Sequence, residues 1–594
     1  MTLFLPKTTI NICFMDNLVG NVYEMRRVMF LIGMALSLQG FAQSENVMEA
    51  IVRLTDTADP ENLDSYEVER LEYFFRRPLR LNRASMAEME SCGLLTPYQL
   101  VSVADYRLRH GDILSYAELA MIEGFGQEIA DALRPFISLD AGDEKKSGRS
   151  FRCDLYTRAG YRYDDAGKYM YGVKCRMEAG KTSASLAFSK PYDRKGYSPE
   201  AYSGNVVWNH ALGKVMLGDF NARFGQGLCI WNSTLIGSLV SPASFMRKPS
   251  GLSSSFSFTG STALTGLAAD ATLGRWKVSA FLATPGIKKS GIGQMSLMPA
   301  VNVSSYGRYG VISMTHYAEF SDFIKDASAY RIPGMKSSVD ASLCVRGINI
   351  FGEFTYDWVA CGIGALCGVD LMPCDMFRLA ALVEGTASQN LKAAFSGELK
   401  NGRMKNHSGN FSVMASVYPE GRYRDIEMGV EFKGQTDWTF QINECLGLRL
   451  KLTERFRNWG RTFKTGVRVD MKYASEHFSG ILRADFQRCV GTGFLGYAEG
   501  GYIKESISLY MRMGIFVVDD WEDRIYVYER DAPGSFNVPA YYGRGVWTAV
   551  NLSWGYSDWG RLYLRASYVG YQLMSPEKRK PGRAELKIQS VFRF

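Results

Sequence analysis

The sequence lacks most of the motifs that mark enzymes and metal sites. Of its 594 residues only five are histidine, and the eleven cysteines include no CxxC pair. The histidines do not combine with the cysteines at ligand spacing. No Gly-x-x-x-x-Gly-Lys-Ser/Thr loop, HExxH pair or Gly-x-Ser-x-Gly elbow occurs. These absences exclude the common phosphate loops, zinc hydrolase motifs and nucleophile elbows, and they predict a protein that is no enzyme and holds no cofactor or metal.

Three weaker candidates each have a structural alternative. Cys361, Cys367 and Cys374 are a possible metal set or ordinary small apolar strand residues. The acidic run Asp519–Asp523 could hold calcium or form a solvated loop. Gly362–Gly368 is rich in glycine, but it does not open a strand–turn–helix unit. We expect the structural alternative in all three.

The chain also has no long apolar run, although 46% of its residues are hydrophobic. The run Val28–Leu38 follows Arg26 and Arg27 and is too short to span a bilayer. A basic start, a short apolar run and small residues before Gln43 predict a signal peptide, with translation starting at Met25. A buried N-terminal helix is the alternative. Residues 1–42 are therefore assigned to an upstream extension and signal peptide.

The last twelve residues, Arg583–Phe594, alternate between apolar and polar positions. Phe594, Phe592, Ile588 and Leu586 share one strand face, and charged residues lie on the other. This ending resembles that of bacterial outer-membrane β-barrels, whose assembly machinery reads the terminal aromatic signal, here Phe592 and Phe594. An edge strand of a soluble β domain is the alternative. The resemblance implies outer-membrane lipid and the assembly machinery as partners.

The same alternation recurs through residues 150–594. Examples are Tyr169–Ala179, Leu446–Leu452, Lys464–Tyr473 and Arg561–Tyr568. Strands with one apolar and one charged face predict a transmembrane barrel with a wet interior, here of about 18 to 22 antiparallel strands. Short turns such as 555–558 are expected in the periplasm. Longer stretches such as 282–304 and 519–543 are expected outside the cell.

Residues 43–139 instead have helical periodicity, and a polar linker follows at 140–149. Residues 43–80 are predicted as a helical segment. Residues 81–139 resemble the tandem helix-hairpin-helix domain of competence DNA receptors, on the strength of Leu81-Asn-x-Ala-Ser85, Asp105-Tyr-Arg107 and Gly124-Phe-Gly126. The resemblance implies a small all-α domain before the barrel, with residues 43–149 in the periplasm. The combination, with Gly218–Gly227 and Asp523–Glu529, is similar to a Bacteroidetes-type group of outer-membrane proteins.

Hairpin glycines allow a tight turn whose free amides can hold a DNA phosphate. The candidate phosphate-binding residues are Gly93, Thr96, Gly124, Phe125 and Gly126. Thr96 replaces the second glycine of the first turn, where it forms a helix N-cap before Pro97. Glu128 follows the second turn, and residues 80–139 carry a net charge of −3. An acidic module has the wrong sign for nucleic acid, so a purely structural role of the turns stays open.

Charge is divided unevenly along the chain. The net charge of +8 comprises −8 in residues 44–139, +15 in residues 140–594 and +1 before them. Basic side chains on the polar strand faces are expected to point into the lumen, because burial in lipid would be costly. These candidates are Lys174, Arg176, Arg449, Lys451, Lys464, Arg468, Lys472, Arg483, Arg561 and Arg565. A basic lumen would favour anions, whereas the alternative is that these residues complement anionic headgroups and neighbouring acids.

Two functions remain open from the sequence. The first is a transport or scaffold barrel with a hairpin module that binds a protein or plugs the pore. The second is a DNA-uptake protein in which the hairpins hold nucleic acid at a basic pore. The opposed charges and the short linker also predict that the helical domain docks on the periplasmic mouth.

Overall fold

The computed structural model describes most of the chain beyond the N-terminal region. The described residues are 47–57, 59–140, 151–164, 166–232, 239–258, 262–285, 296–321, 331–345, 347–374, 376–386, 391–400, 407–418, 428–459, 462–571 and 581–594. The predicted signal peptide and nearly all of the predicted linker lie outside them.

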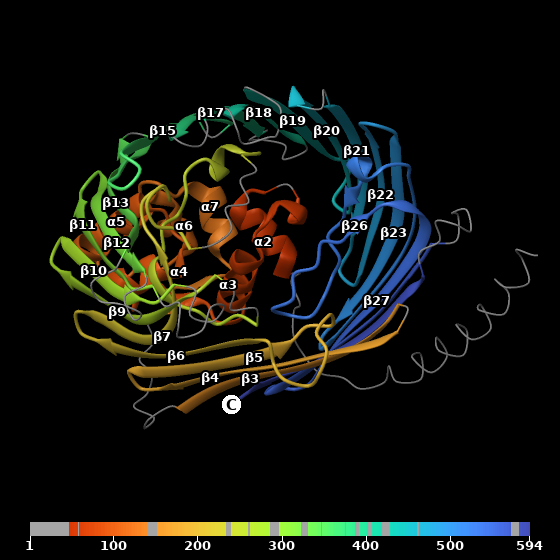
Figure 1. Cartoon of the computed structure of the whole chain (residues 1–594), viewed down its shortest axis with the longest axis horizontal. Helices are drawn as coiled ribbons and strands as arrows, with labels where there is room; N and C mark the ends of the chain where they lie inside the picture. Colours follow the sequence, from red (N-terminus) through yellow and green to blue (C-terminus); the bar gives the residue numbers. More distant parts are fainter. Residues whose placement is uncertain are drawn as a thin grey trace, which may run out of the picture.

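The strands form a closed antiparallel barrel around a helical domain (Figure 1). The wall runs in chain order from β3 to β24 and then through β27, β28 and β29, and β29 pairs with β3 to close the ring. The short strand β8 pairs only with the end of β7, because the rest of β7 pairs with β9. Without β8, the ring has 24 strands within the described part of the chain.

The wall strands of the first half are β3 (Phe151–Tyr163), β4 (Gly167–Ala179), β5 (Thr182–Lys190), β6 (Ala201–His210), β7 (Gly213–Arg223), β9 (Leu264–Leu273), β10 (Trp276–Ala283), β11 (Met298–Gly307), β12 (Gly310–Ser321), β13 (Arg331–Val345), β14 (Ile348–Asp357) and β15 (Gly362–Cys374). Those of the second half are β16 (Phe377–Thr386), β17 (Leu391–Lys400), β18 (His407–Tyr418), β19 (Gly429–Gln441), β20 (Leu446–Arg457), β21 (Thr462–Ala474), β22 (Phe478–Arg488), β23 (Thr492–Lys504), β24 (Ile507–Val518), β27 (Gly543–Ser557), β28 (Gly560–Gly570) and β29 (Arg583–Arg593).

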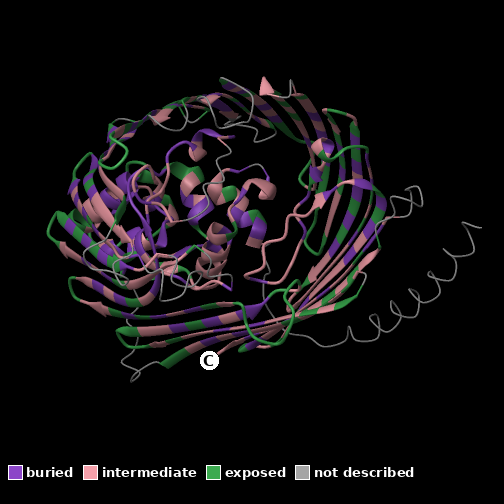
Figure 2. Ribbon diagram, in the orientation of Figure 1, coloured by how far each residue is buried: buried purple, intermediate pink, exposed green. Residues whose placement is uncertain are grey.

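The predicted alternation is confirmed: exposed and buried residues alternate along the wall strands (Figure 2), and the apolar residues are the more exposed set. In β21, Val469 and Met471 are 39% and 38% exposed, whereas Arg468 is 8% exposed. In β29, Leu586 and Ile588 are exposed while Gln589 is buried. A water-soluble domain would bury the apolar set instead. An apolar outer face on a closed ring with no free edge is the surface that lipid covers, so the chain is a transmembrane β-barrel.

The predicted 18 to 22 strands were too few, because many connections are very short. The turn from Ala474 to Phe478 joins β21 to β22, and the turn from Lys504 to Ile507 joins β23 to β24. These turns lie at the end of the barrel where β3 begins and β29 ends, here called the short-turn end. Longer connections lie at the opposite end, including residues 224–263 and 519–542.

Of the stretch 282–304, the two ends are strand, because β10 ends at Ala283 and β11 begins at Met298, and residues 286–295 between them lie outside the described residues. The segment 519–542 contains a helical turn, η5 (Trp521–Asp523), and a small hairpin of β25 (Ile525–Tyr526) and β26 (Ala540–Tyr541). It folds inward rather than away from the barrel. Tyr528 and Phe536 pack against the core of the helical domain.

The helical domain lies inside the ring of strands, not outside its mouth (Figure 1). This differs from the expectation of a domain docked in the periplasm. A ring of 24 strands is wide enough to enclose it, and its acidic surface meets basic side chains of the wall. Its elements are α2 (Val47–Thr55), η1 (Pro60–Asn62), α3 (Ser65–Arg76), β1 (Leu79–Arg80), α4 (Met86–Cys92), α5 (Pro97–His110), α6 (Tyr116–Met121), α7 (Gly126–Leu133) and β2 (Ile137–Ser138). Among the described residues no helix is long and apolar enough to cross a membrane.

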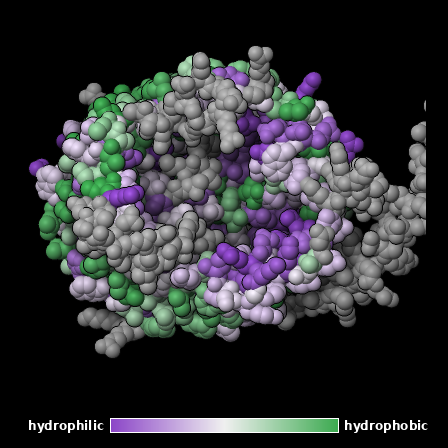
Figure 3. Space-filling model, viewed as in Figure 1, coloured by the Kyte–Doolittle hydropathy of each residue, from purple (hydrophilic) through white to green (hydrophobic). Residues whose placement is uncertain are grey.

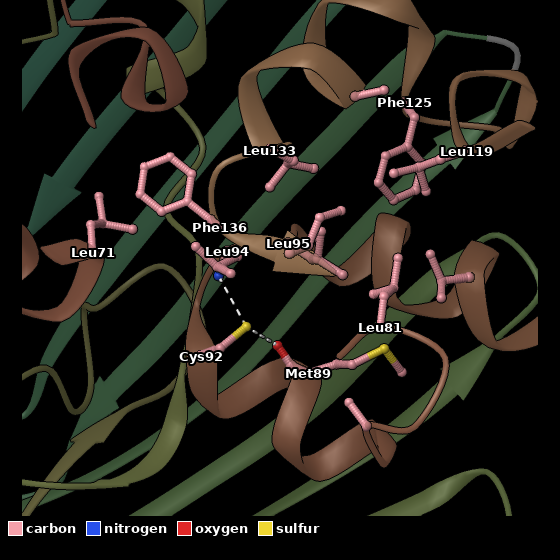
Figure 4. Close-up of a cluster of buried hydrophobic side chains, with 14 of the residues drawn as sticks. Leu71, Leu81, Met89, Cys92, Leu94, Leu95, Leu119, Phe125, Leu133 and Phe136 are labelled. Atoms are coloured by element: carbon pink, nitrogen blue, oxygen red, sulfur yellow. Dashed lines mark hydrogen bonds between the residues drawn. The ribbon is translucent and has the colours of Figure 1, made fainter. Parts of the chain in front are cut away.

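The domain has a hydrophobic core of its own, built from all of its helices (Figure 4). The parallel pair β1 and β2 joins the two ends of residues 79–138. Buried Asn82 donates to the carbonyl oxygens of Ile113 and Leu139, and Arg107 donates to those of Leu81, Asn82 and Ala84. Asn82 and Arg107 therefore connect the segment 81–84 after β1 to α5, to the α5–α6 connection and to the end of β2.

Candidate functional site

The best-defined polar site of the molecule is the interface between the helical domain and the barrel wall. At its centre is Asp59, which lies just before η1 and is 1% exposed. Its carboxylate accepts from Arg449 at 2.7 Å and from Arg468 at 3.1 Å, and it also pairs with Lys451. The two arginines keep wall partners as well, Asp437 at 2.5 Å and Asp485 at 2.7 Å. The ion pairs thus form one network across β19–β22 and the domain.

Glu61 extends this network. It accepts from Arg483 at 2.8 Å and from the backbone N–H of Tyr528 at 3.1 Å. Burial opposes ionisation of Glu61, but Arg483 and Arg468 outweigh it and lower its pKa from 4.5 to about 2. Burial likewise opposes ionisation of Asp59, and its three cations hold the pKa of that carboxyl well below its ordinary value. Both carboxylates are therefore charged at neutral pH.

Other ion pairs bind the domain to other sectors of the wall. Glu69 on α3 pairs with Lys174 of β4. Glu90 on α4 pairs with Lys277 of β10, which is 1% exposed. Arg77, just after α3, donates to Asp154 of β3 at 2.7 Å. Because the ion pairs of the domain lie in three sectors of the ring, at β3–β4, at β10 and at β20–β22, they resist both tilting and withdrawal of the domain.

An apolar contact joins the domain to the strands that follow β10 in the wall. Val101 on α5 packs with Tyr306 and Val311 at the turn between β11 and β12, and all three are buried. These three residues carry no charge, so their contact holds the domain to the wall whether or not the acidic groups are ionised.

The inward segment between β24 and β27 binds both the domain and the wall. The N–H of Gly534 donates to Glu72 of α3 at 2.8 Å. Glu529 pairs with Arg565 of β28, and Asp531 pairs with Lys587 of β29 at 2.9 Å. The domain is therefore in contact with a second lumenal element, which comes from a connection within the barrel sequence rather than from the N-terminal region.

A further connection, between β7 and β9, also folds into the lumen. Its turn wraps the carboxylate of Glu353 on β14, which accepts from the N–H groups of Gln226, Leu228 and Cys229 at 2.8–3.0 Å. Gly225 and Gly227 have φ of 58° and 82°, which the turn requires. The motif Gly218–Gly227 thus forms part of a strand and a backbone loop around a wall carboxylate.

The ten predicted lumen cations have several different environments. Lys174, Arg449, Lys451, Arg468 and Arg483 pair directly with acids of the helical domain. Two of the others contact the inward segment between β24 and β27: Lys464 donates to the carbonyl of Glu522 at 2.7 Å, and Arg565 pairs with Glu529. Arg176 lies 4.6 Å from the ring of Tyr73 in the helical domain. Lys472 lines a cavity, and Arg561 lies beside Gly555 near the β27–β28 turn.

The sequence did not single out Asp59, Glu61, Lys277 or Glu353. Their surroundings contain no local motif, because each partner comes from a distant part of the chain. The only available signal was regional, namely the acidic charge of residues 44–139 against the basic charge of the barrel.

The two hairpin turns differ in accessibility. Gly93 ends α4 with φ 61°, and a Cβ there would meet Arg70 of α3 at 2.1 Å. Thr96 caps α5 by accepting from the N–H of Gln99, so that amide already has a partner. Phe125 is buried, but Gly124 and Gly126 are exposed, and α7 has no side-chain N-cap. The first turn is closed by the protein itself, whereas the second has open backbone amides.

The other candidate sites have structural roles in this fold. Gly362–Gly368 belongs to β15. Asp523 accepts from the N–H groups of Cys489 and Gly491, and Asp519 accepts from Thr492 and Arg544. These carboxylates therefore secure the β22–β23 turn. Within the described ranges, no group of three or more His, Cys, Asp or Glu residues is arranged to hold a metal.

A cavity of about 1070 Å³ lies beside the helical domain. It is bordered by α2 and η1 on one side and by β20–β24 on the other, and it reaches the turns 474–477 and 503–505. Figure 3 shows hydrophilic surface around a hollow of the molecule. The domain therefore leaves part of the lumen unfilled.

Comparisons with known proteins give remote structural similarity only. No protein-family model and no curated protein matches the sequence. The siderophore receptor PirA from Pseudomonas aeruginosa matches with 6% identity and a TM-score of 0.39, over 76% of this chain and 81% of that one. The copper transporter OprC matches with 7% identity and a TM-score of 0.40, over 76% and 81%. The P pilus usher PapC translocation pore matches with 10% identity and a TM-score of 0.37, over 75% and 99%. Similarity at this level identifies no family and assigns no ligand.

Proposed function

We propose that this protein is an outer-membrane transport barrel whose lumen is occupied and restricted by its own helical domain. The observation that carries the proposal is the burial of Asp59 among Arg449, Lys451 and Arg468 of the wall. A buried charge network of this kind is costly to break, because withdrawing Asp59 leaves three cations with one partner fewer. The short-turn end, where β3 begins and β29 ends, is the periplasmic end by the usual barrel orientation.

The geometry favours a plug over a free periplasmic module. The domain contacts the wall through charged pairs and through the apolar contact of Val101. The inward segment 519–542 adds hydrogen bonds to Glu61 and Glu72. Solutes too large for the cavity beside the domain would pass only after the domain shifts, so the protein acts as a gated barrel rather than an open pore.

Single-channel conductance of the intact protein tests this function. We expect low conductance for the full chain and a several-fold higher conductance for a variant that lacks residues 44–139. The double variant Asp59→Asn/Glu61→Gln keeps the domain but weakens its attachment, so it should show frequent large openings. Equal conductance of all three proteins in low salt would contradict the plug.

Nucleic-acid binding through the helix-hairpin-helix turns is the second candidate function. It is favoured by one observation, the exposed turn at Gly124 and Gly126 before the uncapped start of α7. The acidic charge of the domain and the closed first turn oppose it. In this case the domain would receive DNA at the periplasmic end. A docked periplasmic protein would use the same exposed face.

A further inference from the structure

The cavity beside the helical domain contains two charged groups that lack a contact partner. Glu49, in the first turn of α2, and Lys472, on β21, both line it. They interact electrostatically across the space, but no ion pair or hydrogen bond joins their side chains to each other or to any other described residue. Both side chains are exposed to water within the barrel. Lys504, Glu476 and Glu505 also line the cavity, but they belong to the turns 474–477 and 503–505 at its edge. Away from these turns, Glu49 on the domain and Lys472 on the wall are the anionic and the cationic contact point.

The remaining deep cations of the cavity are already paired. Arg449 and Arg483 bind acids of the helical domain and the wall. Arg512 and Arg530 share Glu499 at 2.6 Å and 2.9 Å. These groups make the cavity polar without offering a free charge. Away from the turns 474–477 and 503–505, Lys472 is therefore the cation of the described wall that lines the cavity without an ion pair, and Glu49 is its counterpart on the domain.

We propose that this cavity binds a zwitterionic solute of short-peptide chemistry, with its carboxylate at Lys472 and its ammonium group at Glu49. A purely anionic solute would face Glu49, and a purely cationic one would face Lys472. A volume of about 1070 Å³ exceeds the usual size of a small-ligand pocket, so it has room for a chain of several linked units. The phenol groups of Tyr497 and Tyr510, which also line the cavity, can exchange hydrogen bonds with peptide amides.

The site does not depend on movement of the helical domain, so it stands apart from the proposed gating. Because Glu49 belongs to the domain and Lys472 to the wall, a bound peptide would bridge the two. Binding would then be measurable even in a protein that never opens.

Calorimetric titration of the full-length protein in detergent with trialanine tests the proposal. The comparison peptides are N-acetyl-trialanine, trialanine amide, and the form blocked at both ends. We expect trialanine to bind at least about tenfold more tightly than the doubly blocked form, on the scale of charge-assisted hydrogen bonds, and the singly blocked forms to lie between. Glu49→Gln should weaken trialanine by about tenfold but leave N-acetyl-trialanine unchanged. Lys472→Gln should weaken trialanine but leave its amide unchanged.

Two matched controls remove a charge elsewhere at the short-turn end. Lys181→Gln lies in the β4–β5 turn and Glu444→Gln in the β19–β20 turn, outside the cavity, so both should bind trialanine as the unchanged protein does. Heat-modifiable mobility checks that each variant forms its barrel. The exchanged variant Glu49→Lys/Lys472→Glu should recover binding, with the peptide reversed. Equal affinity for all four peptides, no binding by any of them, or undiminished binding in both single variants would overturn the proposal.

Discussion

The carboxylate of Asp59 accepts a hydrogen bond from the guanidinium of Arg449 at 2.7 Å, although the two residues are 390 positions apart. Asp59 belongs to the segment before the barrel, and Arg449 belongs to strand β20 of the wall. This contact fixes where the acidic charge of the N-terminal region meets the basic charge of the lumen. Four predictions follow from this arrangement and from the turns of the domain and wall.

Replacing Asp59 by Asn should loosen the helical domain. Arg449, Lys451 and Arg468 would keep their charges inside the barrel with one anion fewer, at a cost of about 3–5 kcal/mol for a broken buried pair. We expect faster proteolysis of residues 47–140 in the folded barrel. Asp112→Asn is the control, because Asp112 is an exposed acid of the same domain. Equal digestion of D59N and D112N would show that Asp59 does not anchor the domain.

The attachment should persist through mild acid and fail only in strong acid. The pKa of Glu61 is lowered from 4.5 to about 2 in the folded protein. Its stabilising contribution is therefore fully present above about pH 4.5, and it is lost as pH falls toward 2. The pKa of Asp59 is lowered in the same direction. Protease accessibility of the domain between pH 7 and pH 2 measures this, and Glu61→Gln should flatten the curve. Release already at pH 6 would contradict the role of these two acids.

Deleting Phe594 should reduce the amount of assembled barrel. Phe594 and Phe592 stack with Trp559 of the β27–β28 turn at 6.0 and 6.1 Å, and the backbone of Phe594 pairs with Cys153 where β29 meets β3. The deletion removes the terminal aromatic residue and one end of the closing contact. Heat-modifiable protein in the membrane fraction is the measure, with Arg593→Lys as a variant that keeps Phe594. Undiminished assembly of the deletion would count against the signal.

If the second hairpin turn holds a phosphate, Gly126→Ala should weaken DNA binding of the full-length protein by about 1–3 kcal/mol, as for a lost charge-assisted contact. Gly126 has φ 73° and open space around its Cβ position. Gly111→Ala is the matched control, because Gly111 has φ 88°, equally open space and no following hairpin turn. Binding should fall steeply as salt rises. Absence of binding by the unchanged protein at low salt would end the nucleic-acid hypothesis.

The sequence alone determined the local periodicity of this protein, and with it the strands. Alternation such as that of Val467, Arg468 and Val469 depends only on the two-residue repeat of an extended chain, so it can be recognised without knowing which strand lies next to it. The helical character of residues 47–133 was equally local. The number of strands was not, because it depends on how short each turn is, and 24 strands replaced the expected 18 to 22.

Only the tertiary structure decided where the helical domain lies and which charges meet. The opposed charges of the two regions predicted attraction, but a charge count contains no geometry. For the domain to lie inside the lumen, the ring must be wide enough to enclose it. Cations of the wall must also lie level with Asp59, Glu69 and Glu90. Likewise, the sequence does not show that Arg70 packs against the turn at Gly93 while the space around the Cβ position of Gly126 is open. Three of the ion pairs between domain and wall join residues 105, 187 and 390 positions apart, so the pattern within a local stretch of sequence cannot predict them.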